Sequence, residues 1–249
     1  MIRSGWFEHS SWRYRLPMTA SDHRVLVLHH SEGADQGWLE DAFEEARIDR
    51  VMIRLGSGEE IPGTTNWRGV VSLGGVMGAY EEDTYPFLSA EKQFLAELVR
   101  EGVPVLGICL GCQLLADALG GRAYQSPAPE AGLLSMTMTD AGRDDPVIRV
   151  VPDRVLVSHG DTFDLPPGAE LLAHTDQYRH AFRLGSALAV QFHPEAGPAM
   201  VEGWLRLSGG RNIAKAGVDP EALVAEMRAG EDLMKEQALR FFATWLATL

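Results

Sequence analysis

The sequence predicts an α/β protein built on an open, mostly parallel sheet that is flanked by helices, with an added antiparallel hairpin region. Between residues 24 and 120, strand-like apolar segments alternate with amphipathic helical ones, which is typical of βαβ units. After residue 121 the pattern changes to short apolar segments separated by turns, which is typical of hairpins. Residues 103–108 form a continuous apolar run, as expected of a strand buried on both faces of a parallel sheet.

The first half of the chain supplies the predicted parallel strands and the helices that connect them. Four apolar segments are expected to be strands: 24–30, 50–55, 69–73 and 103–108. Three segments with apolar residues at helical spacing are expected to be helices: 36–46, 89–100 and 110–119. Ser89 is the predicted N-cap of the second helix, and Gly120 and Gly121 end the third.

The second half supplies the predicted hairpins and the C-terminal helices. Short strands are expected at 133–139, 154–157, 170–174 and 187–192. Helices return after Pro198, and the last one, 233–246, has a predicted core face made of Leu239, Phe242, Trp245 and Leu246. The sequence has no internal repeat and no low-complexity linker, and we therefore predict one domain over residues 24–249. Residues 1–23 show no clear period and are interpreted as an N-terminal extension.

Composition excludes several classes of protein. The chain has 22 Lys and Arg against 35 Asp and Glu, a formal charge of −13, which argues against nucleic-acid and anionic-membrane partners. No apolar stretch reaches the roughly 18 residues of a membrane span, and residues 1–18 lack the apolar core of a secretory signal. The chain has two cysteines, Cys109 and Cys112, which are too close to form a disulfide framework. A reducing, cytoplasmic location is therefore predicted.

Cys109 lies where a predicted buried strand gives way to a predicted helix. Such a turn would place its side chain at the carboxyl edge of the sheet, where α/β proteins bind ligands. The helix N-terminus favours a thiolate, and the N–H of Leu110, which has no intrahelical partner, can donate to a developing oxyanion. Gly107 and Gly111 would let the chain turn sharply. The pattern indicates a nucleophile elbow with cysteine in place of serine.

A cysteine nucleophile needs a base, and the base needs a group that orients it. His193 follows a predicted strand, and Glu195 comes two residues later, past a proline. We expect the strand end to hold the imidazole over the sheet edge, where the carboxylate can fix its orientation. Gly74 and Gly75 end another predicted strand and can bring a second backbone N–H close to a ligand.

Three segments form a recognisable pattern: Val103-Pro-Val-Leu-Gly-Ile-Cys-Leu-Gly-Cys-Gln-Leu-Leu-Ala116, Val157-Ser-His-Gly-Asp161 and Gln191-Phe-His-Pro-Glu195. Together they resemble the class I (triad-type) glutamine amidotransferases, and in particular the glutaminase domain of GMP synthase. The similarity runs from about residue 24 to residue 195, with the cysteine and histidine motifs in the family's order and separation. It implies the family's flavodoxin-like fold.

The resemblance also implies a role for each matching residue. Cys109 would attack the side-chain amide carbon of a γ-glutamyl group, His193 would act as general base and then general acid, and Glu195 would orient His193. The N–H groups of Gly75 and Leu110 would form the oxyanion hole. The glutamyl head group would be held, partly through the backbone, by Gly74, Gln113, Ser158, His159, Gly160 and Asp161. Water would hydrolyse the thioester, so we expect no cofactor and no metal.

The sequence departs from the family's pattern at two positions. Val76 stands where relatives usually have proline after the Gly-Gly pair, which puts the exact oxyanion donor in question. Cys112 stands where relatives have histidine or a small residue, and we expect it to pack in the core. Because the sequence ends at residue 249, the synthase domains that follow the glutaminase domain in GMP synthase are expected to be absent.

The same residues also allow other interpretations, in which they have no role in amide hydrolysis. Cys109 and Cys112 are formally a C-x-x-C pair, but a redox pair would not come with a strand-end His-Pro-Glu, and a zinc site would need a second ligand pair. A buried inert thiol is the third alternative for Cys109. His29 and His30 end the first predicted strand at the same sheet edge, and we expect local partners to satisfy them.

Three functions stay open from the sequence. The first is an enzyme that acts alone on a small-molecule substrate, either glutamine or a γ-glutamyl amine or peptide. The second is a glutaminase subunit that delivers ammonia to a separate synthase chain. The third, a binding module without activity, would have no need of the set Cys109, His193 and Glu195. The chain is expected to be a monomer or a homodimer.

Overall fold

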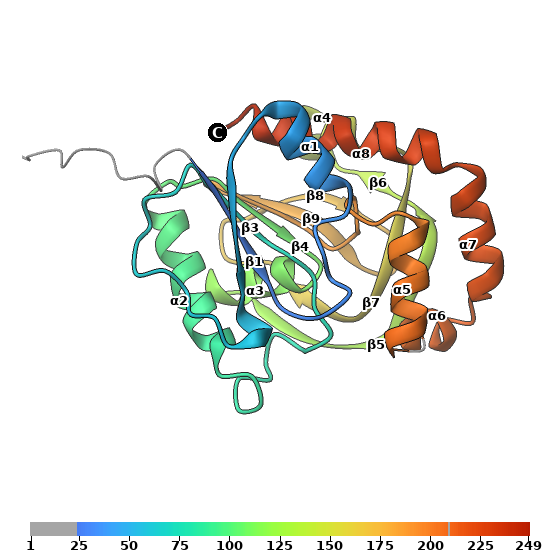
Figure 1. Cartoon of the computed structure of the whole chain (residues 1–249), viewed down its shortest axis with the longest axis horizontal. Helices are drawn as coiled ribbons and strands as arrows, with labels where there is room; N and C mark the ends of the chain where they lie inside the picture. Colours follow the sequence, from blue (N-terminus) through green and yellow to red (C-terminus); the bar gives the residue numbers. More distant parts are fainter. Residues whose placement is uncertain (1–23, 209) are drawn as a thin grey trace, which may run out of the picture.

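The computed structural model describes residues 24–208 and 210–249, so the predicted extension over residues 1–23 lies outside the described residues. An eight-stranded sheet forms the centre, with strand order β2-β1-β3-β4-β10-β9-β8-β6 (Figure 1). Five neighbouring strands are parallel: β2 (Arg50–Arg54), β1 (Val25–His29), β3 (Gly69–Ser72), β4 (Val105–Ile108) and β10 (Ala187–Val190). The remaining three continue the sheet antiparallel: β9 (Arg179–Leu184), β8 (Glu170–His174) and β6 (Thr137–Met138).

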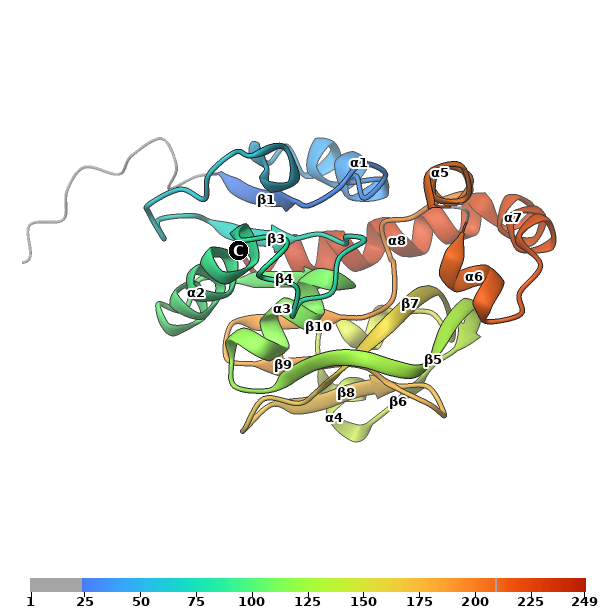
Figure 2. The same cartoon turned by 90° about the horizontal axis from the view of Figure 1, so that it is seen from below.

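A second sheet is a long antiparallel ribbon of β5 (Arg122–Ser135) and β7 (Arg154–Asp164). Its pairing register shifts between Gln125 and Glu130. Figure 2 shows one end of the ribbon lying beside the C-terminal helices, next to α6 (Arg211–Lys215). The predicted fold class, a mostly parallel sheet with an antiparallel addition, is confirmed.

Helices cover both faces of the main sheet (Figures 1 and 2). One face packs against α1 (Trp38–Ala46) and α8 (Glu231–Leu246), and the other against α2 (Phe87–Arg100) and α3 (Leu110–Ala118). Three further helices gather beside the β5–β7 ribbon: α5 (Pro198–Ser208), α6 (Arg211–Lys215) and α7 (Pro220–Ala229). The short elements are α4 (Asp140–Asp144) and the 3-10 turns η1 (Leu55–Ser57) and η2 (Ile148–Val150). Among the described residues, none of these helices is both long and apolar enough to cross a membrane.

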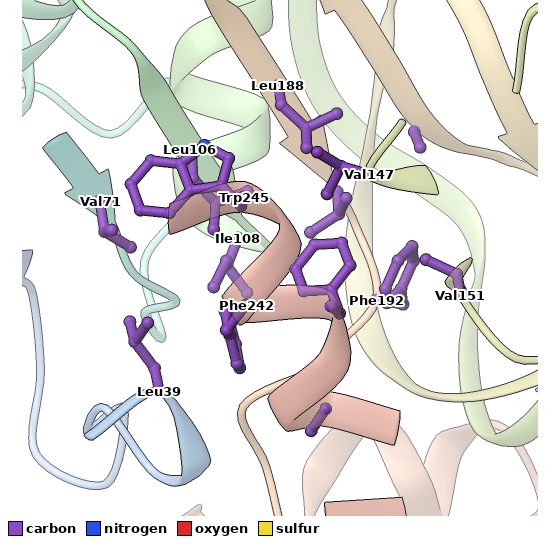
Figure 3. Packing of buried hydrophobic residues seen from close by; sticks show 14 of the residues in the cluster. Leu39, Val71, Leu106, Ile108, Val147, Val151, Leu188, Phe192, Phe242 and Trp245 are labelled. Atoms are coloured by element: carbon purple, nitrogen blue, oxygen red, sulfur yellow. The ribbon is translucent and has the colours of Figure 1, made fainter. Parts of the chain in front are cut away.

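Burial alternates along the first strand as a two-layered core requires. Val25 and Val27 face the α1 and α8 layer, whereas Leu26 and Leu28 face the α2 and α3 layer. The final helix packs on the sheet as predicted, because Phe242 and Trp245 point into the core with side chains of β3, β4 and β10 (Figure 3). The helix therefore belongs to the main core.

Replacing Trp245 with alanine is expected to cost about 3–5 kcal/mol of unfolding free energy, because it removes the largest side chain of this core. Denaturant titration of both proteins measures the difference. Leu233→Ala on the same helix is the matched control, since that side chain is 58% exposed, and it should change stability by less than about 0.5 kcal/mol. Equal losses in the two variants would contradict the packing described here.

Several details differ from the sequence prediction, and one of them is the strand predicted at 154–157, which extends to Asp164 as β7. Ser89 is not the N-cap of its helix, because the helix already begins at Phe87; Pro86, with φ −59°, fits a helix start, and Leu88 is fully buried. The strand predicted at 133–139 is the end of a 14-residue strand followed by a short separate one. Strand β9 was not predicted, because its Arg and His residues obscure an apolar inner face.

Candidate active site

Cys109 occupies a sharp turn between β4 and α3. Its backbone has φ 53° and ψ −106°, a conformation that residues with a Cβ rarely adopt. Its N–H donates to the carbonyl of Val190, at 2.9 Å, which ties the turn to β10. The turn also depends on glycine, since a Cβ on Gly107 would lie 2.5 Å from the Gly111 carbonyl oxygen. The geometry is that of the predicted elbow.

Gly111 is the second glycine that the elbow requires. A Cβ on Gly111 would lie 2.1 Å from the carbonyl oxygen of Ser72 in β3, and a backbone atom cannot rotate away. We expect Gly111→Ala to lower the unfolding free energy by roughly 1–3 kcal/mol or more, measured by denaturant titration. The control is Gly203→Ala in α5, where the nearest atom lies at 3.9 Å; stability there should hold or rise by up to about 1 kcal/mol. A neutral Gly111→Ala would mean that the elbow is looser than described.

His193 and Glu195 follow β10 and lie beside Cys109. The Nδ1 of His193 donates to Glu195 Oε1 at 2.7 Å, and Cys109 lines the same cavity beside the ring. The backbone N–H of His193 donates to the carbonyl of Leu156 at 2.9 Å, which fixes the segment against β7. Burial disfavours the protonated ring, but Glu195 and Cys109 outweigh burial and hold the pKa of His193 well above its usual range. The site therefore favours a protonated His193 ring.

The Gly74–Gly75 peptide lies against the same group. A Cβ on Gly74 would sit 3.6 Å from His193 Cε1 and 3.7 Å from Cys109 Cβ, so the backbone passes close to both. A Cβ on Gly75 would lie 2.5 Å from Leu110 Cδ2 and 2.8 Å from Met77 Sδ, so any larger residue here would displace these side chains. The N–H of Gly75 makes no hydrogen bond to the described part of the chain, and it is free to donate to a ligand.

One cavity of about 690 Å³ joins these residues. Every predicted site residue except Leu110 lines it: Gly74, Gly75, Cys109, Gln113, Ser158, His159, Gly160, Asp161, His193 and Glu195. Leu110 is the first residue of α3, and its side chain packs in the core. Cys112 is also fully buried there, as predicted, and burial raises the pKa of its thiol well above the usual range. Of the two cysteines, Cys109 is the one that faces the cavity.

Part of the cavity wall is polar and tied together by hydrogen bonds. The Gln113 Nε2 donates to the carbonyl of Asp161 at 3.2 Å and to Gln191 Oε1 at 3.0 Å. The Tyr80 hydroxyl donates to Asp161 Oδ1 at 3.3 Å. This arrangement presents amide and carboxylate oxygens to a ligand.

The His159 side chain serves the wall of the cavity through a buried network. Its Nδ1 donates to the carbonyl of Asp161 at 2.8 Å, and its Nε2 faces Glu130 Oε2 at 3.2 Å. The Glu130 carboxylate also accepts from His180 Nε2 at 2.6 Å and from the Thr175 hydroxyl at 2.7 Å. Burial raises the pKa of Glu130, but these hydrogen bonds outweigh burial and lower it to about 2. The network braces the 158–161 segment.

Sequence reasoning missed the contribution of the helices after Pro198. The Trp204 ring of α5 lies 4.8 Å from the His193 ring, centroid to centroid, and its Nε1 donates to the carbonyl of Gly33 at 2.7 Å. Asn212 of α6 approaches Gly160, since a Cβ there would lie 3.0 Å from Asn212 Oδ1. Residues of these helices line the cavity, and no local sequence motif predicts that the helices pack back against it.

The fold and the site together define a class of protein: an α/β protein with a cysteine, a histidine and a carboxylate gathered in one cavity at the carboxyl edge of a parallel sheet. The family model for glutamine amidotransferase class-I matches residues 37–202, more than half of the chain. The chain therefore belongs to the class I glutamine amidotransferase family, as the sequence resemblance indicated.

Individual relatives agree with this assignment. The chain is 36% identical over 149 residues to a GMP synthase [glutamine-hydrolyzing] of Thermomicrobium roseum, covering 55% of this chain and 26% of the relative. A GMP synthase [glutamine-hydrolyzing] of Thermus thermophilus is 36% identical over 152 residues, covering 54% of this chain and 29% of the relative. The chain thus matches between a quarter and a third of these relatives' length.

Solved structures support the fold over nearly the whole chain. A glutamine amidotransferase of Thermotoga maritima superposes with a TM-score of 0.80 at 34% identity, covering 90% of this chain and 97% of that one. A glutamine amidotransferase of Methylobacillus flagellatus has a TM-score of 0.81 at 23% identity, covering 91% and 95% of the two chains. The second likeness bears on the fold alone.

Proposed function

We propose that this protein hydrolyses the γ-glutamyl amide of glutamine, releasing glutamate and ammonia through a thioester on Cys109. The observation that carries the proposal is the His193 ring, which donates to Glu195 and lies beside Cys109 and the Gly74–Gly75 peptide. Glu195 and Cys109 raise the pKa of His193, so the ring can hold the proton that a cysteine nucleophile gives up.

The reaction follows from this geometry. The Cys109 sulfur attacks the amide carbon, a C–S bond forms, and the carbonyl electron pair moves to oxygen. The N–H groups of Gly75 and Leu110 donate to that oxyanion. As the C–N bond breaks, the His193 imidazolium protonates the leaving nitrogen and ammonia departs. His193 then takes a proton from water, which attacks the thioester; glutamate leaves and the thiolate–imidazolium pair is restored.

The polar wall of the cavity supplies the groups for the rest of the substrate. Gln113 and Asp161 present oxygens that can accept from the α-ammonium group of a glutamyl unit. Ser158 and Gly160 line the same side and offer backbone groups for its head. In this assignment the His159 side chain binds no substrate, because both its ring nitrogens are engaged within the protein.

Two alternatives concern the leaving group and the partner. A cavity of about 690 Å³, walled by α5 and α6, leaves room beyond a glutamine side chain, which favours a γ-glutamyl amine or peptide as a second candidate substrate. The similarity to proteins named GMP synthase favours an ammonia-delivering subunit that works with a separate synthase chain. A thiolate nucleophile suits the reducing cytoplasm predicted from the cysteine count.

One experiment separates these alternatives. The purified full-length chain is incubated with glutamine, with asparagine as control, and with a panel of γ-glutamyl amides, and glutamate and amine release are measured. Glutamine turnover supports the proposal, and faster turnover of a γ-glutamyl amine would select the second candidate. Glutamine turnover that rises when a co-purifying chain is added would select the subunit role. No turnover and no labelling by an electrophilic glutamine analogue would overturn all three.

A further inference from the structure

We propose that His30 and Glu91 form a positioning pair behind the oxyanion peptide, with His30 holding the Gly74 carbonyl so that the Gly75 N–H points at the reacting carbonyl. The inference rests on the proposed function of the same site. His30 Nδ1 lies 3.0 Å from the Gly74 carbonyl oxygen. His30 Nε2 lies 3.0 and 2.8 Å from the two carboxylate oxygens of Glu91.

The partners of His30 require its Nδ1 to donate. The Gly74 carbonyl oxygen can only accept, so Nδ1 must carry a proton, and Nε2 shares a hydrogen bond with the Glu91 carboxyl group. Burial opposes a charge on the ring, but Glu91 and the backbone carbonyls outweigh burial and raise the pKa of His30. The Ser72 hydroxyl donates to Glu91 Oε1 at 2.8 Å and fixes the carboxylate from β3. The His30 and Glu91 side chains are both fully buried.

Peptide geometry links this pair to the oxyanion hole. In a planar trans peptide the C=O and the N–H point in opposite directions. The Gly74 C=O and the Gly75 N–H belong to one peptide, so a carbonyl held by His30 directs the N–H to the opposite side, where the backbone passes close to Cys109 and His193. The His30 bond therefore sets the direction of the proposed donor.

The Gly74–Gly75 peptide needs a fixed hydrogen-bond partner because its backbone can adopt several conformations. Two consecutive glycines can rotate their shared peptide at little cost. The next residue, Val76, is 72% exposed and gives the segment little packing. Neither His30 nor Glu91 is among the described residues that line the cavity, so neither is placed to touch substrate. They can act on the reaction only through Gly74 and Gly75.

Two amide variants of His30 separate positioning from general packing. His30→Asn places an N–H close to the position of Nδ1 and keeps the bond to Gly74, whereas His30→Gln reaches toward Glu91 and loses the bond to Gly74. An oxyanion donor is worth about 10²–10³ in kcat, so a misdirected one should lower kcat at least about tenfold in His30→Gln, with KM changed less than about twofold. His30→Asn should keep at least about five times more of the wild-type kcat than His30→Gln.

Controls test whether the loss is specific to oxyanion formation. The rate at which iodoacetamide alkylates Cys109, a reaction without an oxyanion, should be the same in wild type and His30→Gln. His29→Gln, one residue away, is the matched control and should keep the wild-type kcat. Equal loss of kcat in the two His30 variants, a loss confined to KM, or a parallel loss of alkylation would overturn the proposal and indicate a structural role.

A measurement on the wild-type protein keeps the test independent of activity and of variant folding. Nitrogen-15 NMR of the histidine rings at neutral pH should show a proton on Nδ1 of His30. An Nδ1 without a proton would overturn the proposal even if glutamine is hydrolysed. If the wild type shows no glutamine turnover, the proposed function fails, and this spectrum, together with the Gly74–Gly75 peptide orientation in a crystal structure of His30→Gln, decides the anchoring separately.

Discussion

Replacing Cys109 with alanine is expected to reduce glutamine hydrolysis to the uncatalysed background, a loss of roughly 10⁴-fold or more in kcat. In the proposed mechanism the substitution removes the sulfur that would form the thioester, and water held in the same cavity lacks both the nucleophilicity and the position of that sulfur. Glutamate release, followed by a coupled assay at saturating glutamine, measures the loss. The fold should tolerate the change, because alanine is smaller than cysteine at a site that opens into the cavity.

Cys112→Ala is the matched control for this prediction. Cys112 is fully buried, and burial keeps its pKa far above neutrality, so it stays a thiol and takes no part in the chemistry. We expect the variant to keep kcat within about threefold of wild type while losing about 1–2 kcal/mol of stability through the lost sulfur contacts. Full activity in Cys109→Ala, or a comparable loss in both variants, would contradict the assignment of the nucleophile.

Glu195→Gln is the second substitution with a large expected effect. The carboxylate accepts the Nδ1 proton of His193 at 2.7 Å and holds the ring in the orientation that reaches Cys109. An amide can present either N–H or C=O to that nitrogen and carries no charge, so the ring loses both its fixed tautomer and its stabilising anion. We expect kcat to fall by about 10²–10⁴-fold, as when the orienting carboxylate of other triads is neutralised.

The pH dependence of this variant has a definite sign. In the wild type, Glu195 and Cys109 outweigh burial and raise the pKa of His193. Removing the carboxylate charge lowers that pKa, so the imidazolium and the thiolate paired with it are lost at a lower pH. The alkaline limb of the kcat/KM profile should therefore move to lower pH in Glu195→Gln. Glu170→Gln, at an exposed position of β8, is the control, and a shifted limb there, or an unshifted limb in Glu195→Gln, would contradict this assignment.

The positions of the proposed catalytic residues were predictable because these residues lie where regular elements end. Cys109 follows a fully apolar strand and precedes a helix, so the sequence predicts a turn at this residue. In the structure Cys109 has a φ of 53°. Gly74, Gly75 and His193 follow two other strands of the same parallel sheet, and parallel strands bring such ends to one edge. Local pattern and topology were sufficient to bring these residues together.

The remainder depends on contacts between distant segments, which leave no local signature. Glu91 is fully buried, although the apolar spacing of its helix gives no reason to expect a buried carboxyl group there. Its partner His30 lies 61 positions earlier in the sequence. Trp204 reaches His193 from a helix that an amphipathic pattern cannot orient in space. The Glu130 network joins three strands, β5, β7 and β9, of which the last was not predicted. In each case tertiary packing, not spacing, selects the partner.

The central claim is that Cys109 attacks the γ-carbonyl group of glutamine, and the most direct test is covalent labelling by the electrophilic glutamine analogue 6-diazo-5-oxo-L-norleucine. The full-length chain is treated with the analogue, digested, and mapped by peptide mass spectrometry while residual glutamine turnover is followed. We expect one label per chain, on Cys109, with loss of turnover in proportion to labelling and protection by glutamine. Turnover that persists with Cys109 fully labelled, or inactivation by a label on any other residue, would contradict it.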